Sequence, residues 1–206
     1  SFKLNEYQSS IEVCRDLLAN SPYDRSQVRR ALAPTVPLHC SDPSIMACGN
    51  LAEEFDVELH MHLAESKIQA VSAMQLYWKI ITAHPTDLNF LRPRFTAAHF
   101  VWADADDISR ITDAGCSVSH NPGSHLRLRS GIAPARAMRE QGPRVGIGTD
   151  GSSCSDNQNM FEAMRIGAFP SRIVSPDPET WISTENVIDM ATRGGAAVLG
   201  FEKEIG

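Results

Sequence analysis

The segment LHMHLAES, residues 59–66, decides the fold of this chain. Together with the residues before it, the segment forms VELHMHL at 57–63, an apolar run with the length and composition of a β-strand. Side chains two apart on a strand point to the same face, so His60 and His62 are expected to project together. Neutral imidazole is a common zinc ligand, which makes this strand a candidate part of a metal site.

Predicted strands and helices alternate on both sides of this segment. The predicted strands are 28–34, 57–63, 95–102, 116–121 and 144–151, and the predicted helices are 7–20, 43–55, 66–83, 103–115, 130–142, 158–169 and 184–199. Such alternation predicts βαβ units, and apolar strands are typical of a parallel sheet covered by helices. The fold class is therefore α/β.

Polar residues stand at the carboxyl ends of four of these strands. They are His62, His99, His120 and Asp150, and each follows an apolar stretch. In a (β/α)8 barrel this end of the strands carries the active site. Three histidines and an aspartate at neighbouring strand ends predict one shared site.

Composition and charge narrow the class of protein. The chain has 206 residues, of which 42% are hydrophobic and 21% are charged, as in one soluble globular domain. Its net charge is −6 and it lacks a Lys/Arg cluster, which argues against a nucleic-acid partner. No apolar run reaches the roughly 18–20 residues of a membrane span, so no membrane partner is expected. Five scattered cysteines without a CxxC pair predict a reducing, cytoplasmic location.

Four segments resemble one known family. They are HMHLAES (60–66), AAHFVW (97–102), SHNPGSHLRLRSGIAP (119–134) and VGIGTDGSSCSDNQNMFEAMR (145–165). They are similar to the amidohydrolase superfamily, and within it to the aminohydrolase and chlorohydrolase branch. That branch includes guanine, 8-oxoguanine, isoxanthopterin and S-adenosylhomocysteine deaminases and triazine hydrolases. The resemblance runs from about residue 7 to the end and implies a (β/α)8 barrel with one divalent metal, Zn²⁺ or alternatively Fe²⁺.

Two alignments of the strands compete under this resemblance. In the first, HMH is the HxH metal-binding pair of barrel strand 1. In the second, HMHLAE belongs to strand 5, with His62 as the ligand, Glu65 as the proton shuttle and His60 as a neighbour. One βα unit takes roughly 30 residues, so the interval 62–99 holds a single unit and not the four that separate strands 1 and 5. The second alignment fits, and the five strands become strands 4–8.

The resemblance then implies a role for each candidate residue. The metal ligands are His62 and Asp150, and the catalytic residues are Glu65, His99 and Asp150. The substrate-binding residues are Glu65, His99, Trp102, His120, Asn121 and His125. His125 stands where members of the branch often have Asn, which leaves its contact with the substrate open.

The same alignment predicts a partial barrel. Residues 1–206 correspond to the C-terminal part of an amidohydrolase barrel, without strands 1–3 and without the small β-domain. The HxH pair that would supply two further metal ligands is expected upstream, since HMH is the single HxH in the sequence. Five strands leave two edges open, so we expect either another segment or a second copy, as in a homo-oligomer, to cover them.

Three functions remain open from the sequence. The first is hydrolysis of a carbon–nitrogen bond other than a peptide bond, as in deamination of a purine, pterin or pyrimidine-like ring by a zinc-activated water. The second is a triazine-type chlorohydrolase or amidohydrolase on the same fold. The third is a catalytically silent fragment that serves for self-association or binding. The first two predict a small heterocyclic substrate, and the sequence does not separate them.

Overall fold

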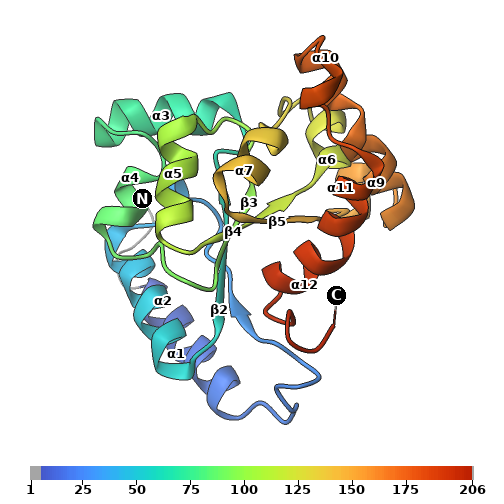
Figure 1. Ribbon diagram of the computed structural model, residues 1–206. Helices are drawn as coiled ribbons and strands as arrows, with labels where there is room; N and C mark the ends of the chain where they lie inside the picture. Colours follow the sequence, from blue (N-terminus) through green and yellow to red (C-terminus); the bar gives the residue numbers. More distant parts are fainter. Residues whose placement is uncertain (1–5, 206) are drawn as a thin grey trace.

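The computed structural model describes residues 6–205, and its centre is a parallel five-stranded sheet. The strands lie in sequence order, β1-β2-β3-β4-β5 (Figure 1). Their bounds are β1 Ala31–Leu32, β2 Glu58–Leu63, β3 Phe95–His99, β4 Ser117–His120 and β5 Arg144–Ile147. Each neighbouring pair is parallel, so all five carboxyl ends meet at one edge. The α/β class is confirmed.

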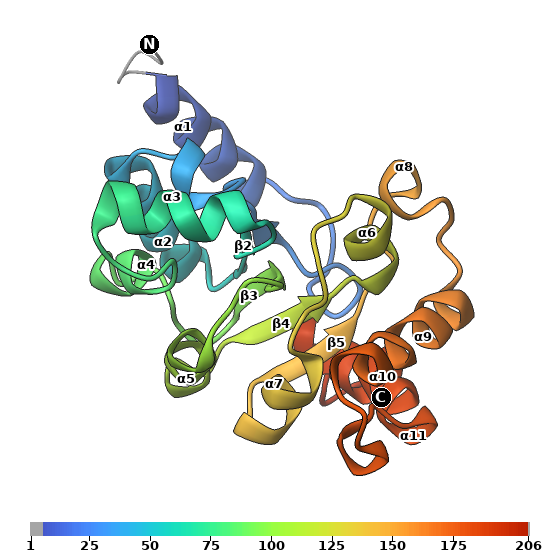
Figure 2. The ribbon, with the colours of Figure 1, turned by 90° about the horizontal axis from the view of Figure 1, so that it is seen from above.

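Helices connect the strands, and several of them cover the convex side of the sheet. Before β4 they are α1 Glu6–Ala19, η1 Pro37–His39, α2 Asp42–Phe55, α3 Lys67–Tyr77, α4 Ala83–Asp87 and α5 Ala105–Asp113. After β4 they are α6 Pro122–Arg127, α7 Ala135–Gln141, α8 Ser152–Ser155, α9 Met160–Ala168, α10 Pro170–Val174, η2 Pro178–Thr180, α11 Thr184–Asp189, the π-turn η3 Met190–Gly194 and α12 Gly195–Val198. In Figure 2 the sheet curves, and α2, α4, α5 and α7 follow its convex side.

Alternation along β2 separates the core from the site. Leu59, Met61 and Leu63 are buried among the helices, whereas His60 and His62 lie on the other face. The strand register places Thr96 beside His60 and Ala98 beside His62 on the neighbouring strand. The concave face is therefore small or polar, and the convex face is hydrophobic.

The end of the chain packs against the lower part of the concave face. The Thr96 hydroxyl donates to the carbonyl oxygen of Val198 at 3.3 Å. A Cβ atom at Gly146 would lie 3.0 Å from Cγ2 of Val198 and 3.1 Å from Cα of Gly195, so glycine lets α12 approach β5 closely. Helix α12 thus covers the sheet below the histidines.

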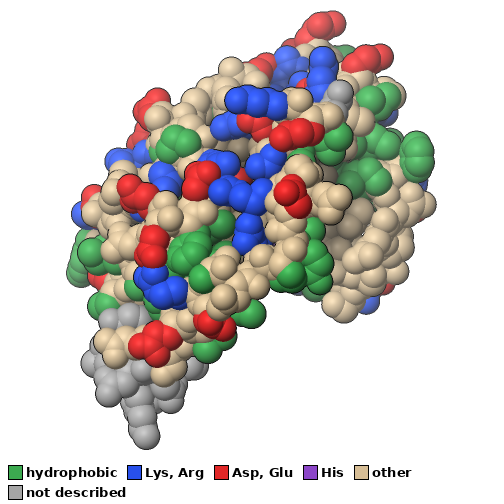
Figure 3. Space-filling view, turned by 90° about the horizontal axis from the view of Figure 1, so that it is seen from below, with side chains coloured by type: hydrophobic (Ala, Val, Ile, Leu, Met, Phe, Trp, Pro, Cys, Tyr) green, Lys and Arg blue, Asp and Glu red, His purple; other side chains and the backbone are tan. Residues whose placement is uncertain are grey.

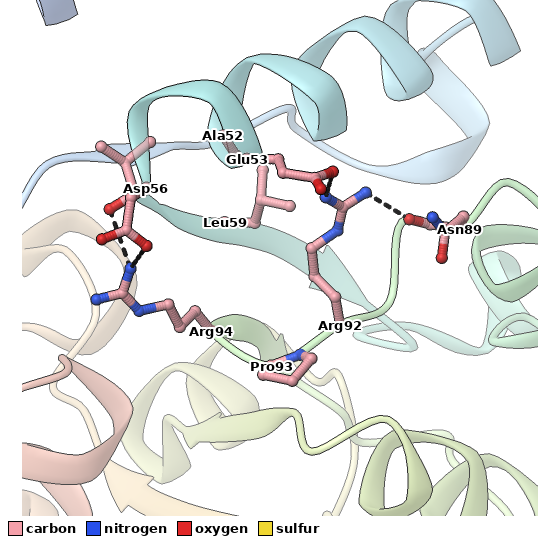
Figure 4. A pocket seen from close by; sticks show the side chains of 9 residues that line it. Ala52, Glu53, Asp56, Leu59, Asn89, Arg92, Pro93 and Arg94 are labelled. Atoms are coloured by element: carbon pink, nitrogen blue, oxygen red, sulfur yellow. Dashed lines mark hydrogen bonds and ion pairs between the residues drawn. The ribbon is translucent and has the colours of Figure 1, made fainter.

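Ion pairs occupy the opposite end of the strands from the histidines. A hollow of about 340 Å³ there is lined by Arg92 and Arg94, which pair with Glu53 and Asp56 of the α2 region (Figure 4). Arg92 also donates to the carbonyl oxygen of Asn89 at 2.6 Å. Seen from below in Figure 3, side chains of both signs intermingle on the surface. These pairs join α2 to the loop before β3, so this end has a structural role.

Several predicted boundaries are wrong. The strand expected at 28–34 is reduced to Ala31–Leu32, and the strand expected at 95–102 ends at His99. The helix expected at 66–83 ends at Tyr77, because Trp78 takes a left-handed conformation with φ 56°. The helix expected at 130–142 begins at Ala135, after Pro134. Helix α6, which follows Asn121, lies in a segment for which the sequence predicts no helix.

Two further findings concern the cysteines and membrane-spanning helices. All five cysteines are free. Within residues 6–205, we find no helix with the length and hydrophobicity needed to cross a membrane.

Candidate active site

Four predicted site residues converge at the carboxyl ends of the strands. His62 and His99 lie on neighbouring strands, and their rings stack with centroids 5.2 Å apart. Nε2 of His99 lies 4.0 Å from Oδ2 of Asp150, which lies in the loop shortly after β5 ends at Ile147. Glu65 lies beyond the end of β2 and lines the same hollow as His62. The parallel sheet thus gathers residues that are distant in sequence.

The backbone holds His62 in one orientation. Its Nδ1 lies 3.0 Å from the carbonyl oxygen of Thr35, so Nδ1 carries the hydrogen and donates. Nε2 is then the free acceptor, which is the form that binds a metal. Sequence reasoning missed Thr35, because the contact uses a backbone carbonyl that leaves no signature in residue type.

His99 is the most enclosed residue of the group. Its Nδ1 lies 3.2 Å from Nε2 of His125 and 3.4 Å from Nδ2 of Asn121. Burial lowers the pKa of His99, and nearby Glu65 and Asp150 offset part of that effect. A neutral imidazole at this position presents Nε2 toward Asp150.

Asp150 is held in its ionised form. Burial alone would raise its pKa, but the Ser124 side chain, the backbone N–H of Gly151 and the two histidines His99 and His62 together hold the pKa below its usual value. The Gly151 N–H donates to Oδ1 of Asp150 at 2.6 Å. A carboxylate in this state is able to bind a cation or accept a proton.

Glu65 stands at the rim of a hollow. The hollow measures about 370 Å³, and its lining includes Thr35, His39, His62, Glu65 and Ile68. Gln69 receives a hydrogen bond from the backbone N–H of Glu65 at 3.2 Å, and its amide donates to Oε2 of Glu65 at 3.5 Å. These contacts fix the carboxylate beside His62 while leaving it accessible from the hollow.

The strand ends carry a strained backbone. Ala64, His99, Phe100 and Asp150 have φ between 50° and 73°, the left-handed region that residues other than glycine seldom adopt. Each such residue costs on the order of 1–3 kcal/mol, and such strain concentrates at functional sites. Here it turns the chain sharply where β2, β3 and β5 end.

The predicted substrate-binding residues take different positions. Asn121 and His125 are buried behind His99, and His125 is only 2% exposed. Trp102 is partly exposed, and its indole N–H donates to the carbonyl oxygen of Ser130 at 2.5 Å. His120 is buried at the end of β4 and lines a separate cavity beside helix α7. The structure therefore brings His62, Glu65, His99 and Asp150 together, with Asn121 and His125 as their support.

The donors present fit part of a metal site. In the described part of the chain, no three His, Cys, Asp or Glu side chains are grouped so that they hold a metal. His62 and Asp150 supply a free imidazole nitrogen and a carboxylate. His60 lies on the same face but lines a different hollow with Glu58 and Arg29, and burial lowers its pKa.

Comparison with known proteins identifies close relatives. The chain is 36% identical over 173 residues to a 5-methylthioadenosine/S-adenosylhomocysteine deaminase of Nitratidesulfovibrio vulgaris, covering 84% of this chain and 39% of that protein. The fold is similar to a zinc-bound adenosine deaminase from Xanthomonas campestris, with TM-score 0.87, 28% identity and coverage of 98% of this chain and 45% of that one. It is also similar to the zinc complex of atrazine chlorohydrolase from Arthrobacter aurescens, with TM-score 0.88, 30% identity and coverage of 94% and 43%.

These similarities show the fold and the family. The chain spans about 40% of the length of the curated relatives that it matches. Its five strands correspond to part of an amidohydrolase barrel, which confirms the expected partial (β/α)8 architecture. The amidohydrolase family matches residues 3–206, and the chain therefore belongs to that family.

Proposed function

We propose that this chain contributes the strand 4–8 half of the active site of a metal-dependent deaminase that acts on an adenosine-like heterocycle. The observation that carries the proposal is the convergence of four residues at the carboxyl ends of the strands: His62 and Glu65 line one hollow, His62 stacks on His99, and His99 faces Asp150. Relatives named as deaminases of adenosine derivatives support this substrate class.

The metal of the proposed site is zinc. His62 Nε2 and the Asp150 carboxylate would hold it, since Nδ1 of His62 is already bonded to Thr35. We propose that two further ligands come from an HxH pair on a segment other than residues 1–206. When bound, zinc would lower the pKa of water and so supply hydroxide near neutral pH. The zinc-bound relatives support this choice over iron.

The remaining chemistry belongs to the side chains. Glu65 stands at the rim of the hollow, where it can donate a proton to a ring nitrogen and make the carbon that bears the amine more electrophilic. Asp150, ionised and beside His99, accepts the proton from the attacking water. His99 is held by His125 and Asn121 and donates a hydrogen bond to the oxygen that develops negative charge. Asp150 would then pass its proton to the amino group, so that ammonia leaves, and the proton of the new hydroxyl group would return to Glu65 as the carbonyl forms.

We also propose how the sheet is completed. Residues 1–206 would form the C-terminal part of an eight-stranded barrel, with β1 to β5 as strands 4–8. The edges of β1 and β5 would then pair with further strands, or with a second copy of the chain as a homo-oligomer. Either arrangement would enclose the concave face that carries His60 and His62.

A second function is supported by one observation. The fold matches a zinc-bound atrazine chlorohydrolase as closely as it matches an adenosine deaminase. The same acid and the same metal would serve a triazine substrate, with chloride as the leaving group. The two reactions differ in the released product and are therefore directly distinguishable.

The test is a product assay on zinc-loaded protein in which residues 1–206 are combined with the proposed HxH-bearing segment, with the 206-residue chain alone as the comparison. The substrates are 5-methylthioadenosine, S-adenosylhomocysteine, guanine and atrazine, scored for ammonia and for chloride. We expect ammonia from an adenosine derivative, released about 10²–10⁴-fold more slowly by the Glu65→Gln variant. Chloride from atrazine alone would favour the second function. Protein that carries zinc and releases neither product would contradict both enzymatic functions. It would support the third function, a catalytically silent fragment that self-associates.

A further inference from the structure

A second cavity lies beside helices α7 and α10, apart from the hollow that holds His62 and Glu65. Its volume is about 250 Å³, and most of its lining is apolar or small, including Ile132, Pro134, Ala137, Pro170 and Val174. Ligand sites for small molecules are typically concave, mainly apolar and equipped with a few placed polar groups.

Hydrogen bonds fix the walls of this cavity. The backbone N–H of Ile182 donates to Oγ of Ser171 at 3.0 Å, and the indole N–H of Trp181 donates to the carbonyl oxygen of Ser175 at 2.8 Å. Arg136 donates to the carbonyl oxygen of Trp181 at 3.4 Å, which joins α7 to the segment after α10. The cavity is therefore formed without a ligand.

Most polar side chains of the lining already have partners. Ser171 donates to the carbonyl oxygen of Ala168 at 2.9 Å, and Thr180 donates to that of Asp177 at 2.8 Å. Arg136 and Glu140 pair with each other at 2.6 Å, which leaves no free charge for an ionic ligand.

His120 is the exception among these polar side chains. His120 is one of the residues that line the cavity, it is only 3% exposed, and its Nδ1 has no hydrogen-bond partner. A buried polar atom without a partner is rare, because it has lost its water and gained nothing in return. Because Nδ1 has no hydrogen-bond partner, the tautomer of the ring is not fixed. The ring is therefore able to present either a donor or an acceptor.

His120 also connects the cavity with the catalytic edge. Its ring centroid lies 5.2 Å from that of His125, and Nε2 of His125 lies 3.2 Å from Nδ1 of His99. A ligand that moves the His120 ring would therefore also shift His125, which contacts His99.

We propose that this cavity is a second ligand site, which takes a small, neutral, flat molecule with an apolar body and one N–H or O–H group that donates to His120. The apolar lining would contact the apolar body of the ligand. The unpartnered imidazole would accept the hydrogen bond from its polar group. Arg136 and Glu140 already pair with each other, so the lining favours a neutral ligand over a phosphate or a carboxylate. This inference concerns residues outside the proposed catalytic hollow and holds whether or not the chain is a deaminase.

The probes are indole and indene, two bicyclic molecules of similar shape of which only indole has an N–H group. Binding to the 206-residue chain is measured by calorimetry and by NMR of the histidine rings. We expect saturable binding of both probes, with indole about five-fold tighter, as one net hydrogen bond predicts. In His120→Phe the two affinities should become equal. The ring signals of His120 and His125 should move with indole.

Two variants of the same helix locate the site. Val174 lines the cavity and is 67% exposed, so Val174→Trp should block it without disturbing the core. Ile173 is 77% exposed and is not part of the lining, so Ile173→Trp is the matched control and should bind indole as the wild type does. No saturable binding to the wild type, or indole binding that survives Val174→Trp, would overturn the proposal.

Discussion

Nε2 of His99 lies 4.0 Å from Oδ2 of Asp150, across the carboxyl ends of β3, β4 and β5. Both residues have positive φ, so each side chain leaves the sheet at a sharp turn. Burial keeps the imidazole neutral, and the surrounding donors keep the carboxylate ionised. A neutral imidazole beside an ionised carboxylate is suited to proton transfer, with the carboxylate as the acceptor.

Replacement of Asp150 tests its role toward a metal. Asp150→Asn removes the anionic donor but keeps its size, so zinc affinity should fall at least about 10-fold. Asp156→Asn is the matched control, because Asp156 is exposed and pairs with Arg127 instead. Zinc is measured by competition with a chromophoric chelator. Equal zinc affinity in both variants would remove Asp150 from the ligand set.

Glu65→Gln tests the proton shuttle. The amide keeps the hydrogen bonds to Gln69 but has no proton to give, so kcat for ammonia release should fall about 10²–10⁴-fold while zinc content is unchanged. The control is Glu53→Gln, a carboxylate on α2 that pairs with Arg92 at the other end of the strands. If both variants kept wild-type turnover, Glu65 would have no role in proton transfer.

Sequence patterns predicted the sheet and the converging residues, because both follow from local rules. An apolar run bounded by turns indicates a strand, and parallel strands bring their last residues together, as with His62 and His99. The bond from Thr35 to His62 was not predictable, because backbone carbonyls are common to all residues. The position of His120 in a separate cavity depends on which helices pack beside β4, which is a tertiary property. Helix α6 lies in a segment whose Pro, Gly and Ser favour a loop in isolation, so packing overrides propensity there.

Buried His120 predicts a particular loss of stability in acid. Burial lowers the pKa of His120 to about 4, whereas the pKa of a histidine in the unfolded chain is about 6.5. Between these values the unfolded chain binds more protons, so stability is full above about pH 6.5 and falls as the pH drops toward 4. Each such histidine contributes a slope of about 1.4 kcal/mol per pH unit. Urea unfolding at several pH values should show a shallower slope in His120→Phe than in the wild type.

The exposed His39, replaced in the same way, is the control for this experiment. His125 is buried beside His120 with its pKa lowered to about 2, so the double variant should be shallower still. Identical slopes in His120→Phe and the wild type would mean that His120 gains a partner or solvent in the folded protein, contrary to the enclosed position described above.

The adjacent glycines Gly194 and Gly195 should respond in opposite ways to alanine. A Cβ atom at Gly194 would lie 2.2 Å from the carbonyl oxygen of Val145 on β5, a backbone atom that cannot move aside. Gly194→Ala should therefore destabilise the fold by about 1–3 kcal/mol, as overpacking does. At Gly195 the nearest atom would be 3.7 Å away, an ordinary contact, so Gly195→Ala should stabilise by about 0.5–1 kcal/mol through helix propensity. Urea unfolding of both variants measures the difference, and equal stabilities would show that η3 does not pack against β5 at this distance.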